Sequence, residues 1–563
     1  MADLAVVELA VPFPKSVVPI SSTHSSISDY QLKEHASSAA PIIEPTSVPG
    51  FSPGWRFYAI FGSLCIITLV VALDATTISV ALPIISQALH GSAIEAFWSG
   101  TSFLLACTVF QPTFAAFSYS FGRKPMILFA LMLFTIGAIV AAISENFTVL
   151  LGGRSIQGVG AGGMISLTEV VVTDLIPLRE RGKWFGFLSI TWAVGSVSGP
   201  LIGGSFAGSV SWRWIFWINL PFCGLGFVTI PLFLRLKKPQ GELYDKLVSV
   251  DWVGAALLPA SVTSFLIPLS WGGVMYSWSS WRTLVPLMLG VFGLIGFIVF
   301  ESSIPHQPLV RMEIFKSRTA LANYFGITVH GMLLWCLLYY LPLYYEAVKD
   351  YSPLISGVAV LPETFTVAPT ALVAGILISI SGRFRWAVWT GWSITVLGMG
   401  LLYLLSPTTS IPAWISLNLL PGLGIGLLFP GMEFAVQAAA GQNDVAYAAA
   451  MYNFMRAFGQ SIGVALGGAV FQSQFKRELA RYPELSGKAS QLSQDASSLV
   501  QLIKAMAKDQ PERAMIVHAY ADSLKVLWAV MAGLAFVALV VSSLTKGLSL
   551  DEELVTDQGL RED

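Results

Sequence analysis

Charged side chains stand inside several of the long apolar runs of this sequence. Placing a charge in hydrocarbon costs about 2.5–3.5 kcal/mol on insertion scales, so each such residue requires a partner, water or a function. A carboxyl group with little access to water can load and release a proton near neutral pH, whereas an arginine keeps its charge and can hold a nearby carboxylate ionised. This chemistry is typical of proton coupling, with a purely structural buried contact as the alternative at each position. The residues concerned are Asp74, Arg154, Glu169, Glu363, Glu433 and Arg456.

The strongest proton-coupling candidates in this set are Asp74, Arg154, Glu433 and Arg456. Glu169 can instead sit near a membrane surface, and Glu363 can face the outer part of a cavity. His330, the one histidine in these runs that we consider, is better explained as a core histidine with its hydrogen bonds satisfied.

The elements that must position these charges are membrane helices. Of the 563 residues, 55% are hydrophobic and 12% are charged, whereas a soluble surface needs roughly a quarter charged residues. A helix needs about 20 apolar residues to cross the hydrocarbon, and the sequence has fourteen such runs, which predicts an all-α polytopic membrane protein. They cover approximately 57–80, 98–118, 126–143, 149–171, 184–207, 215–234, 252–271, 283–301, 320–341, 354–380, 386–405, 412–437, 445–471 and 522–545.

Basic residues predict the orientation of the helices. Five alternate short loops are rich in Lys and Arg, while the loops between them carry only Arg213, Arg282 and Lys349. Because short cytoplasmic loops are enriched in basic residues, both termini are expected in the cytoplasm. The long outside loop, about 472–521, contains a possible amphipathic surface helix at 490–507, and the sequon at Asn146 is a possible N-glycosylation site.

Two glycine patterns recur at one offset and reveal an internal repeat. The glycines of 158–162 match those of 422–426, and those of 195–204 match those of 459–468, in both cases 264 residues later. Two six-helix halves of this kind are the layout of rocking transporters with a central site. The sequence thus predicts five parts. They are a disordered cytoplasmic tail (1–54), an N-terminal half (55–236), a linker with two inserted helices (237–303), a C-terminal half (304–545) and an acidic cytoplasmic tail (546–563).

Several function classes are disfavoured by the same sequence. A net charge of −1 argues against a nucleic-acid partner. The chain has no phosphate-binding loop, HExxH or GxSxG motif, so neither ATP-driven work nor membrane-enzyme chemistry is expected. Its four cysteines lie singly in apolar segments, which predicts small buried hydrophobes rather than a metal site. No cofactor or metal is expected.

Five motifs, in order along the chain, resemble those of the fourteen-helix drug:proton antiporter branch of the major facilitator superfamily, especially its fungal multidrug and toxin efflux members. They are LDATTISVALP at 73–83, WSGTSFL at 98–104, RSIQGVG at 154–160, GSVSGPLIGG at 195–204 and WRWIFWINLP at 212–221. The resemblance implies the major facilitator fold, a proton-transfer role for Arg154 and Gln157, and an antiporter motif. The motif residues are Gly195, Gly199, Pro200, Gly203 and Gly204.

The loop between the second and third runs departs from the family pattern. Where the family has an acidic residue that locks the two halves, this chain has Tyr119, and Ala115 replaces the first glycine of the motif. The charge contact that the family uses is therefore absent. We expect the cytoplasmic gate to depend on Gly122, Arg123, Lys124, Asp174, Arg179 and Arg181 instead.

The resemblance implies a proton-coupled antiporter that exports amphipathic small organic molecules, namely drugs, toxins or secondary metabolites, by alternating access. Its expected partners are the small-molecule substrate, protons and the lipid bilayer, and the expected state is a monomer in the plasma membrane, with the vacuolar membrane possible. Alternatives are a narrow-specificity porter of a basic amino acid or iron chelate, and a membrane sensor that has lost transport. The residues that could line a substrate cavity are Trp335, Tyr339, Glu363, Phe365 and Phe429.

Overall fold

The computed structural model describes residues 53–560 except 79–80, 92, 238, 274, 305–306, 494–495, 553, 555 and 557. Fourteen helical segments in this described part are long and apolar enough to cross a membrane, which confirms the predicted number. They are α1 (Trp55–Thr77), α3 (Ala93–Phe121), α4 (Arg123–Ala142), α5 (Phe147–Leu175), α6 (Arg181–Ser209), α7 (Trp214–Trp217) continued by α8 (Asn219–Phe233), α10 (Trp252–Trp271), α11 (Trp281–Ser303), α12 (Arg318–Ala347), α13 (Pro353–Ser381), α14 (Arg385–Leu401), α15 (Ile411–Ala439), α16 (Val445–Leu479) and α20 (Pro511–Ser542). The predicted disordered tail, residues 1–54, lies outside the described residues except for Pro53 and Gly54.

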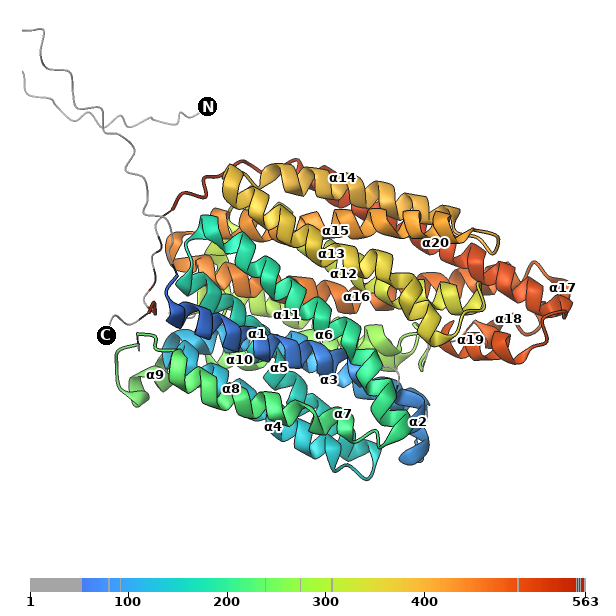
Figure 1. Ribbon diagram of the computed structural model, residues 1–563, viewed down its shortest axis with the longest axis horizontal. Helices are drawn as coiled ribbons and strands as arrows, with labels where there is room; N and C mark the ends of the chain where they lie inside the picture. The colour runs from blue at the N-terminus through green and yellow to red at the C-terminus, as the bar shows by residue number, and fades with distance from the viewer. Residues whose placement is uncertain are drawn as a thin grey trace, which may run out of the picture. The chain divides into compact units, whose positions relative to one another are not determined.

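These helices run alongside one another between two ends of a bundle (Figure 1). The tail end carries Gly122, the 3₁₀ turn Leu178–Glu180 and the described residues within 546–560. The loop end carries Asn146, residues 210–213 and the described residues within 480–510. Short helices fill some of the connections. They are α2 (Leu82–Ala88), α9 (Leu243–Ser249), α17 (Pro483–Ser486), α18 (Ala489–Leu492) and α19 (Ala496–Ala505).

The long loop at 472–521 is shorter than expected. Helix α16 continues to Leu479 and α20 already begins at Pro511, because polar residues can extend a helix past the point where its apolar run ends. The amphipathic segment predicted at 490–507 includes α19, whose Leu499, Val500 and Ile503 are buried in the C-terminal core. Its apolar face thus packs on the protein.

The glycine repeat appears in the packing of the two halves. On α6, Gly199 lies against Thr76 of α1, and on α16 the matching Gly463 lies against Met332 of α12. Because equivalent glycines contact Thr76 and Met332, helices α1 and α12 are equivalent in the two halves. Their residues correspond at an offset of 256, whereas the glycine patterns correspond at an offset of 264. Small residues allow such close approach of helices within a membrane.

Two large apolar clusters form the cores. One joins α1, α3, α4, α5, α6 and α8, and the other is built mainly from α12 to α16 and α20. Helices α10 and α11 pack on each other, with Gly290 against Phe265, and α11 has many exposed apolar side chains. The all-α membrane fold expected from the sequence is confirmed for the described residues.

Candidate functional site

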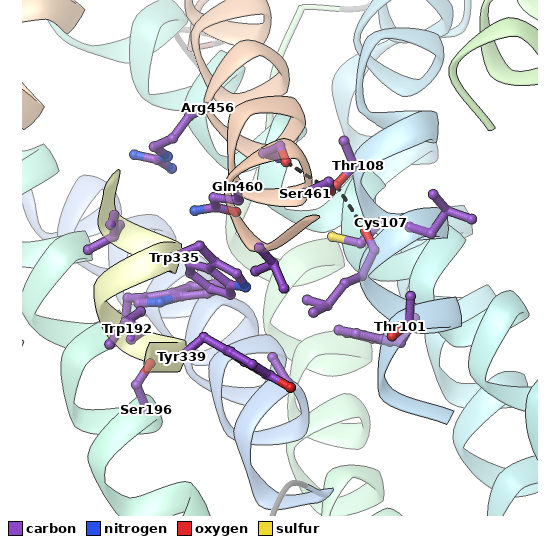
Figure 2. A pocket seen from close by; sticks show the side chains of 18 of the residues that line it. Thr101, Cys107, Thr108, Trp192, Ser196, Trp335, Tyr339, Arg456, Gln460 and Ser461 are labelled. Atoms are coloured by element: carbon purple, nitrogen blue, oxygen red, sulfur yellow. Dashed lines mark hydrogen bonds between the residues drawn. The ribbon is translucent and has the colours of Figure 1, made fainter. Parts of the chain in front are cut away.

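A cavity of about 1180 Å³ lies between the two helix sets. Aromatic side chains such as Trp192 of α6 and Trp335 of α12 line it together with polar groups, including Gln460 of α16 (Figure 2). Its lining reaches Ser86 and Met275, which belong to segments at the loop end. A largely apolar wall with a few polar groups is typical of a site for small organic molecules.

Of the five residues predicted to line this cavity, three line it and two do not. Trp335, Tyr339 and Phe429 do line it. Phe365 does not, because its side chain is 65% exposed on the outer face of α13. Glu363 is fully buried in α13 but does not belong to the lining, and neither of its carboxyl oxygens has a hydrogen-bond partner among the described residues. Hydropathy assigns a residue to a helix but does not tell which face points inward.

Asp74 and Arg154 form a buried ion pair between α1 and α5. Arg154 Nη1 lies 2.5 Å from Asp74 Oδ2, and the other carboxylate oxygen accepts from Gln157 Nε2 and Asn219 Nδ2, both at 2.8 Å. Arg154 also donates to the Ser99 carbonyl at 3.1 Å. Three donors from α5 and α8 thus converge on this one carboxylate. The three residues assigned to proton coupling in this half are thus in direct contact.

Asn219 completes this network although it was not among the predicted site residues. It stands at the start of α8, inside the motif at 212–221, and the amide in an otherwise apolar segment was the available signal. The guanidinium of Arg154 lies 4.2 Å from the ring centre of Phe103, and Phe103 faces the cavity while Asp74 and Arg154 do not. In this conformation the pair is sealed from the cavity.

A second charged cluster lines the cavity directly. Glu169 of α5, Glu433 of α15 and Arg456 of α16 all belong to its lining, and their charged groups interact with one another. Arg456 donates to Asn453 Oδ1 at 2.7 Å and lies 4.9 Å from the ring centre of Phe429. The cluster therefore brings together groups from both halves. His330 lies near this cluster. Its Nε2 lies 3.2 Å from the Ile425 carbonyl, but its buried Nδ1 has no hydrogen-bond partner among the described residues, so the expectation that its hydrogen bonds are all satisfied is wrong.

An aromatic contact closes the tail end where the family's acidic residue is missing. The ring of Tyr119, on α3, stacks on that of Tyr447, on α16, with centres 4.0 Å apart. Arg123 covers the outer face of Tyr119 at 3.9 Å, and Arg311 lies 4.6 Å from the Tyr447 ring centre and pairs with Asp444 at 2.7 Å. Stacked rings with cations on both sides thus join the two halves. Sequence reasoning noticed the missing charge but not its replacement, since Tyr447 is distant in the chain.

The basic residues predicted for this gate make contacts of two kinds, within the N-terminal half and across to the C-terminal half. Arg123 pairs with Asp174 at 2.9 Å within the N-terminal half, while Arg181 crosses to Gln437 of α15 at 2.8 Å. Arg179 also crosses, donating to the Ser379 carbonyl at 2.9 Å. Lys124 instead donates to the carbonyl of Pro231, within its own half. Gly122, with φ of 97°, makes the turn into α4.

The C-terminal segment lies across the same end. Thr556 donates to Asp174 at 2.9 Å, the Gln558 side chain accepts from the Arg123 backbone at 3.1 Å, and Asp551 pairs with Arg179 at 2.6 Å. The acidic tail predicted at 546–563 thus contacts the gate in its described part.

The antiporter-motif residues lie on α6. Gly195, Gly199 and Gly203 are buried against α1, whereas Gly204 is exposed. Helix α6 continues through Pro200 from Arg181 to Ser209. The close contact is made two residues from Asp74, at Thr76, so the motif supports the helix that carries the buried acid.

Asn146 is exposed at the loop end and caps α5, accepting from the Val149 backbone at 2.9 Å. Its glycosylation stays a prediction.

The helices, the repeat and the central cavity define a membrane transporter of the major facilitator type. The family model described as Major Facilitator Superfamily matches residues 64–464, and the chain belongs to this family. Its members are transporters rather than enzymes.

Fungal relatives resemble the chain over nearly its whole length. It is 53% identical to "MFS transporter L2" of Phoma sp. over 91% of this chain and 86% of that protein. It is 37% identical to "MFS-type efflux pump LUC4" of Fusarium sp., over 90% of this chain and 91% of the other. A third, "Acurin A biosynthesis cluster MFS-type transporter" of Aspergillus aculeatus, is 36% identical over 90% and 92%. Relatives are thus named as transporters and efflux pumps.

A solved structure shows the same fold. The human organic anion transporter MFSD10 (TETRAN) aligns with a TM-score of 0.53 and 17% identity, over 87% of this chain and all of that one. At this identity the likeness concerns the fold alone.

Proposed function

We propose that this transporter exports amphipathic small organic molecules in exchange for protons, by alternating access. The observation that carries the proposal is a cavity of about 1180 Å³ between two helix sets, with the Asp74–Arg154 pair buried directly beside it. The tail end is taken as cytoplasmic, in agreement with the basic loops there, and the membrane is the plasma membrane. One chain carries the complete cavity, in keeping with a monomer.

The structure is closed at the tail end and its cavity reaches the loop end. The Tyr119–Tyr447 stack and the Arg181–Gln437 hydrogen bond hold the halves together on one side. In the proposed orientation this is the outward-facing state, in which cargo leaves and protons enter. The opposite state requires these contacts to part.

Asp74 is the proposed proton carrier. Its carboxylate accepts hydrogen bonds from Arg154, Gln157 and Asn219. Protonation removes the charge that holds these donors, and the released donors allow α1 to shift along α6, where glycines permit close contact. Loss of the proton restores the network. Proton binding and helix position are therefore linked.

The cargo class follows from the walls of the cavity. Trp192, Trp335, Tyr339 and Phe429 offer flat apolar surfaces, and Gln460 offers hydrogen bonds. Such a lining favours amphipathic compounds over small ions or sugars. Relatives named as efflux pumps support export.

The test is the accumulation of a panel of fluorescent or toxic amphipathic compounds in transporter-deficient cells that express this chain. We expect that the chain lowers the accumulation of some compounds and that a protonophore restores it. In cells expressing Asp74→Asn, we expect no protonophore-sensitive decrease in accumulation. Export that continues unchanged with the protonophore would contradict proton coupling.

A further inference from the structure

Glu169 and Glu433 occupy equivalent positions in the two halves. They are separated by 264 residues, the same offset that relates the glycine patterns of α5 to α15 and of α6 to α16. Equivalent residues of two pseudo-symmetric halves face one another only near the axis that relates the halves. The two carboxyl groups do so here, at the wall of the cavity.

The surroundings of this pair leave it with an excess of negative charge. Arg456 is the cation next to both carboxyl groups, and the hydroxyl of Tyr452 lies beside all three. Asn453 lies next to Glu169, whose buried Oε2 has no hydrogen-bond partner among the described residues. Two carboxylates thus face one nearby guanidinium, and Arg181 contributes only from further away.

We propose that Glu169 and Glu433 share one exchangeable proton, distinct from that of Asp74, and that this proton allows the tail end to close when no cargo is bound. This inference rests on the proposed proton-coupled transport. A hydrogen bond between two carboxyl groups needs one proton, which stays covalently bound to one oxygen and is donated to an oxygen of the other group. Without that proton the two like charges repel each other across the halves.

The consequence is a rule for exchange. When the tail end opens, the two carboxyl groups separate, water reaches them, and the shared proton passes to water on that side. The halves then close again only if a proton returns or if bound cargo contributes the missing stabilisation. An empty, deprotonated transporter therefore stays open at the tail end until cargo or a proton binds.

Hydrogen bonds connect this pair to the gate. Glu433 Oε1 accepts from Gln437 Nε2 at 3.1 Å, and Gln437 Oε1 accepts from Arg181 Nη1 at 2.8 Å. Arg181 also donates to the carbonyls of Thr173 and Ile176, at 2.8 Å each, within its own N-terminal half. Separation of the carboxyl groups therefore pulls on the contact that joins the halves at the tail end.

The experiment measures opening of the tail end as a function of pH, without cargo, in the purified full-length protein in nanodiscs. Spin labels are placed at Lys237, which follows α8 of the N-terminal half, and at Arg383, which precedes α14 of the C-terminal half. Both residues are exposed at this end, and the four native cysteines are replaced first. Pulsed electron paramagnetic resonance gives the distribution of distances between the two labels. It is measured from about pH 5 to about pH 9, the range in which buried glutamates titrate. We expect the population with the longer distance to grow as pH rises.

Variants identify the groups responsible. Glu169→Gln and Glu433→Gln keep the shape and a hydrogen-bonding partner but remove the need for a shared proton, so the short distance should dominate at every pH. Glu301→Gln is the matched control, because this buried glutamate lies on α11 outside the cavity, and it should keep the wild-type response.

The inference is overturned if the wild type shows no pH-dependent opening, or if both glutamine variants retain it. Failure of the proposed function is a separate result, because protonophore-insensitive export concerns transport in cells and leaves the distance measurement unaffected. A lost pH response in Asp74→Asn, with a normal one in Glu433→Gln, would assign the proton to Asp74 alone and would also overturn the inference.

Discussion

The two halves of this transporter share their helix packing but differ in the polar groups that the packing holds. By the offset of 256 residues between α1 and α12, His330 stands where the N-terminal half has Asp74. By the offset of 264 residues between α5 and α15, Asn418 stands where that half has Arg154. Asn418 donates to the Tyr345 hydroxyl at 2.7 Å and to the Ala359 carbonyl at 3.1 Å, so the place of an ion pair is taken by neutral hydrogen bonds.

This difference indicates a division of labour between the halves. The small residues that permit close helix contact are retained in both, whereas the buried ion pair is present in one. Charges that the two halves do share, at Glu169 and Glu433, lie where the halves meet. Helix packing is thus common to the two halves, whereas the distribution of charge distinguishes them.

The largest effect is expected at the position that distinguishes the halves. Asp74→Asn leaves Arg154 without its counter-charge, and breaking a buried pair in this way costs about 3–5 kcal/mol. Because an asparagine side chain cannot carry the exchanged proton, proton-driven export should fall at least about tenfold, which corresponds to about 1.4 kcal/mol. His330→Gln, at the equivalent position, should change export by much less. Export assays with membrane abundance measured by immunoblot check both, and equal losses would remove the distinction between the halves.

The next effect concerns the packing that the halves have in common. Gly199→Leu forces a side chain into Thr76, and overpacking of this kind costs about 1–3 kcal/mol. We expect reduced transport and a lower melting temperature of the purified protein. Gly204→Leu is the matched control because Gly204 is exposed on the same helix. If the two variants behave alike, the close contact between α6 and α1 is not what the glycine motif provides.

A smaller effect is expected at the tail-end gate. Tyr119→Ala removes the stack on Tyr447, and aromatic pairs contribute about 0.5–1.5 kcal/mol beyond their buried area. The tail end should then open more often, seen as a larger long-distance population between the spin labels at Lys237 and Arg383. Tyr119→Phe keeps the ring and should resemble the wild type. A closed population that survives in the alanine variant would show that the other contacts suffice.

The smallest effect is expected at the loop end, where Asp350 pairs with Lys508 at 2.8 Å and Arg513 at 3.1 Å. The hydrogen bond from Lys508, together with the nearby Arg513 and Lys504, holds the pKa of Asp350 below its usual range. The stabilisation is therefore present at neutral pH and disappears as pH falls through this lowered pKa. Because solvent screens these partly exposed charges, Asp350→Asn should cost no more than about 1 kcal/mol. Thermal unfolding of the wild type and the variant at neutral and acidic pH measures this difference in stability. A larger destabilisation by Asp350→Asn at acidic than at neutral pH would contradict the prediction.

The fold was predictable because its main signals are local. Runs of about 20 apolar residues report membrane spans directly, and the glycine patterns at one offset reveal the repeat. The ends of helices were less predictable, as at 472–521, since polar residues continue a helix without an apolar signal. Which face of a helix points inward was not predictable either, and Phe365 was placed in the cavity although it faces outward.

The sequence by itself determined the membrane class, the family and the charges buried within the helices, because hydropathy and motif spacing are properties of short segments. Only the tertiary structure decided which of those charges meet. Asn219 joins Asp74 from a distant helix, Tyr447 takes over the gate contact at Tyr119, and Glu433 faces Glu169. The physical reason is that electrostatic and stacking interactions act over a few ångströms in space, and the packing of helices far apart in the chain sets those distances.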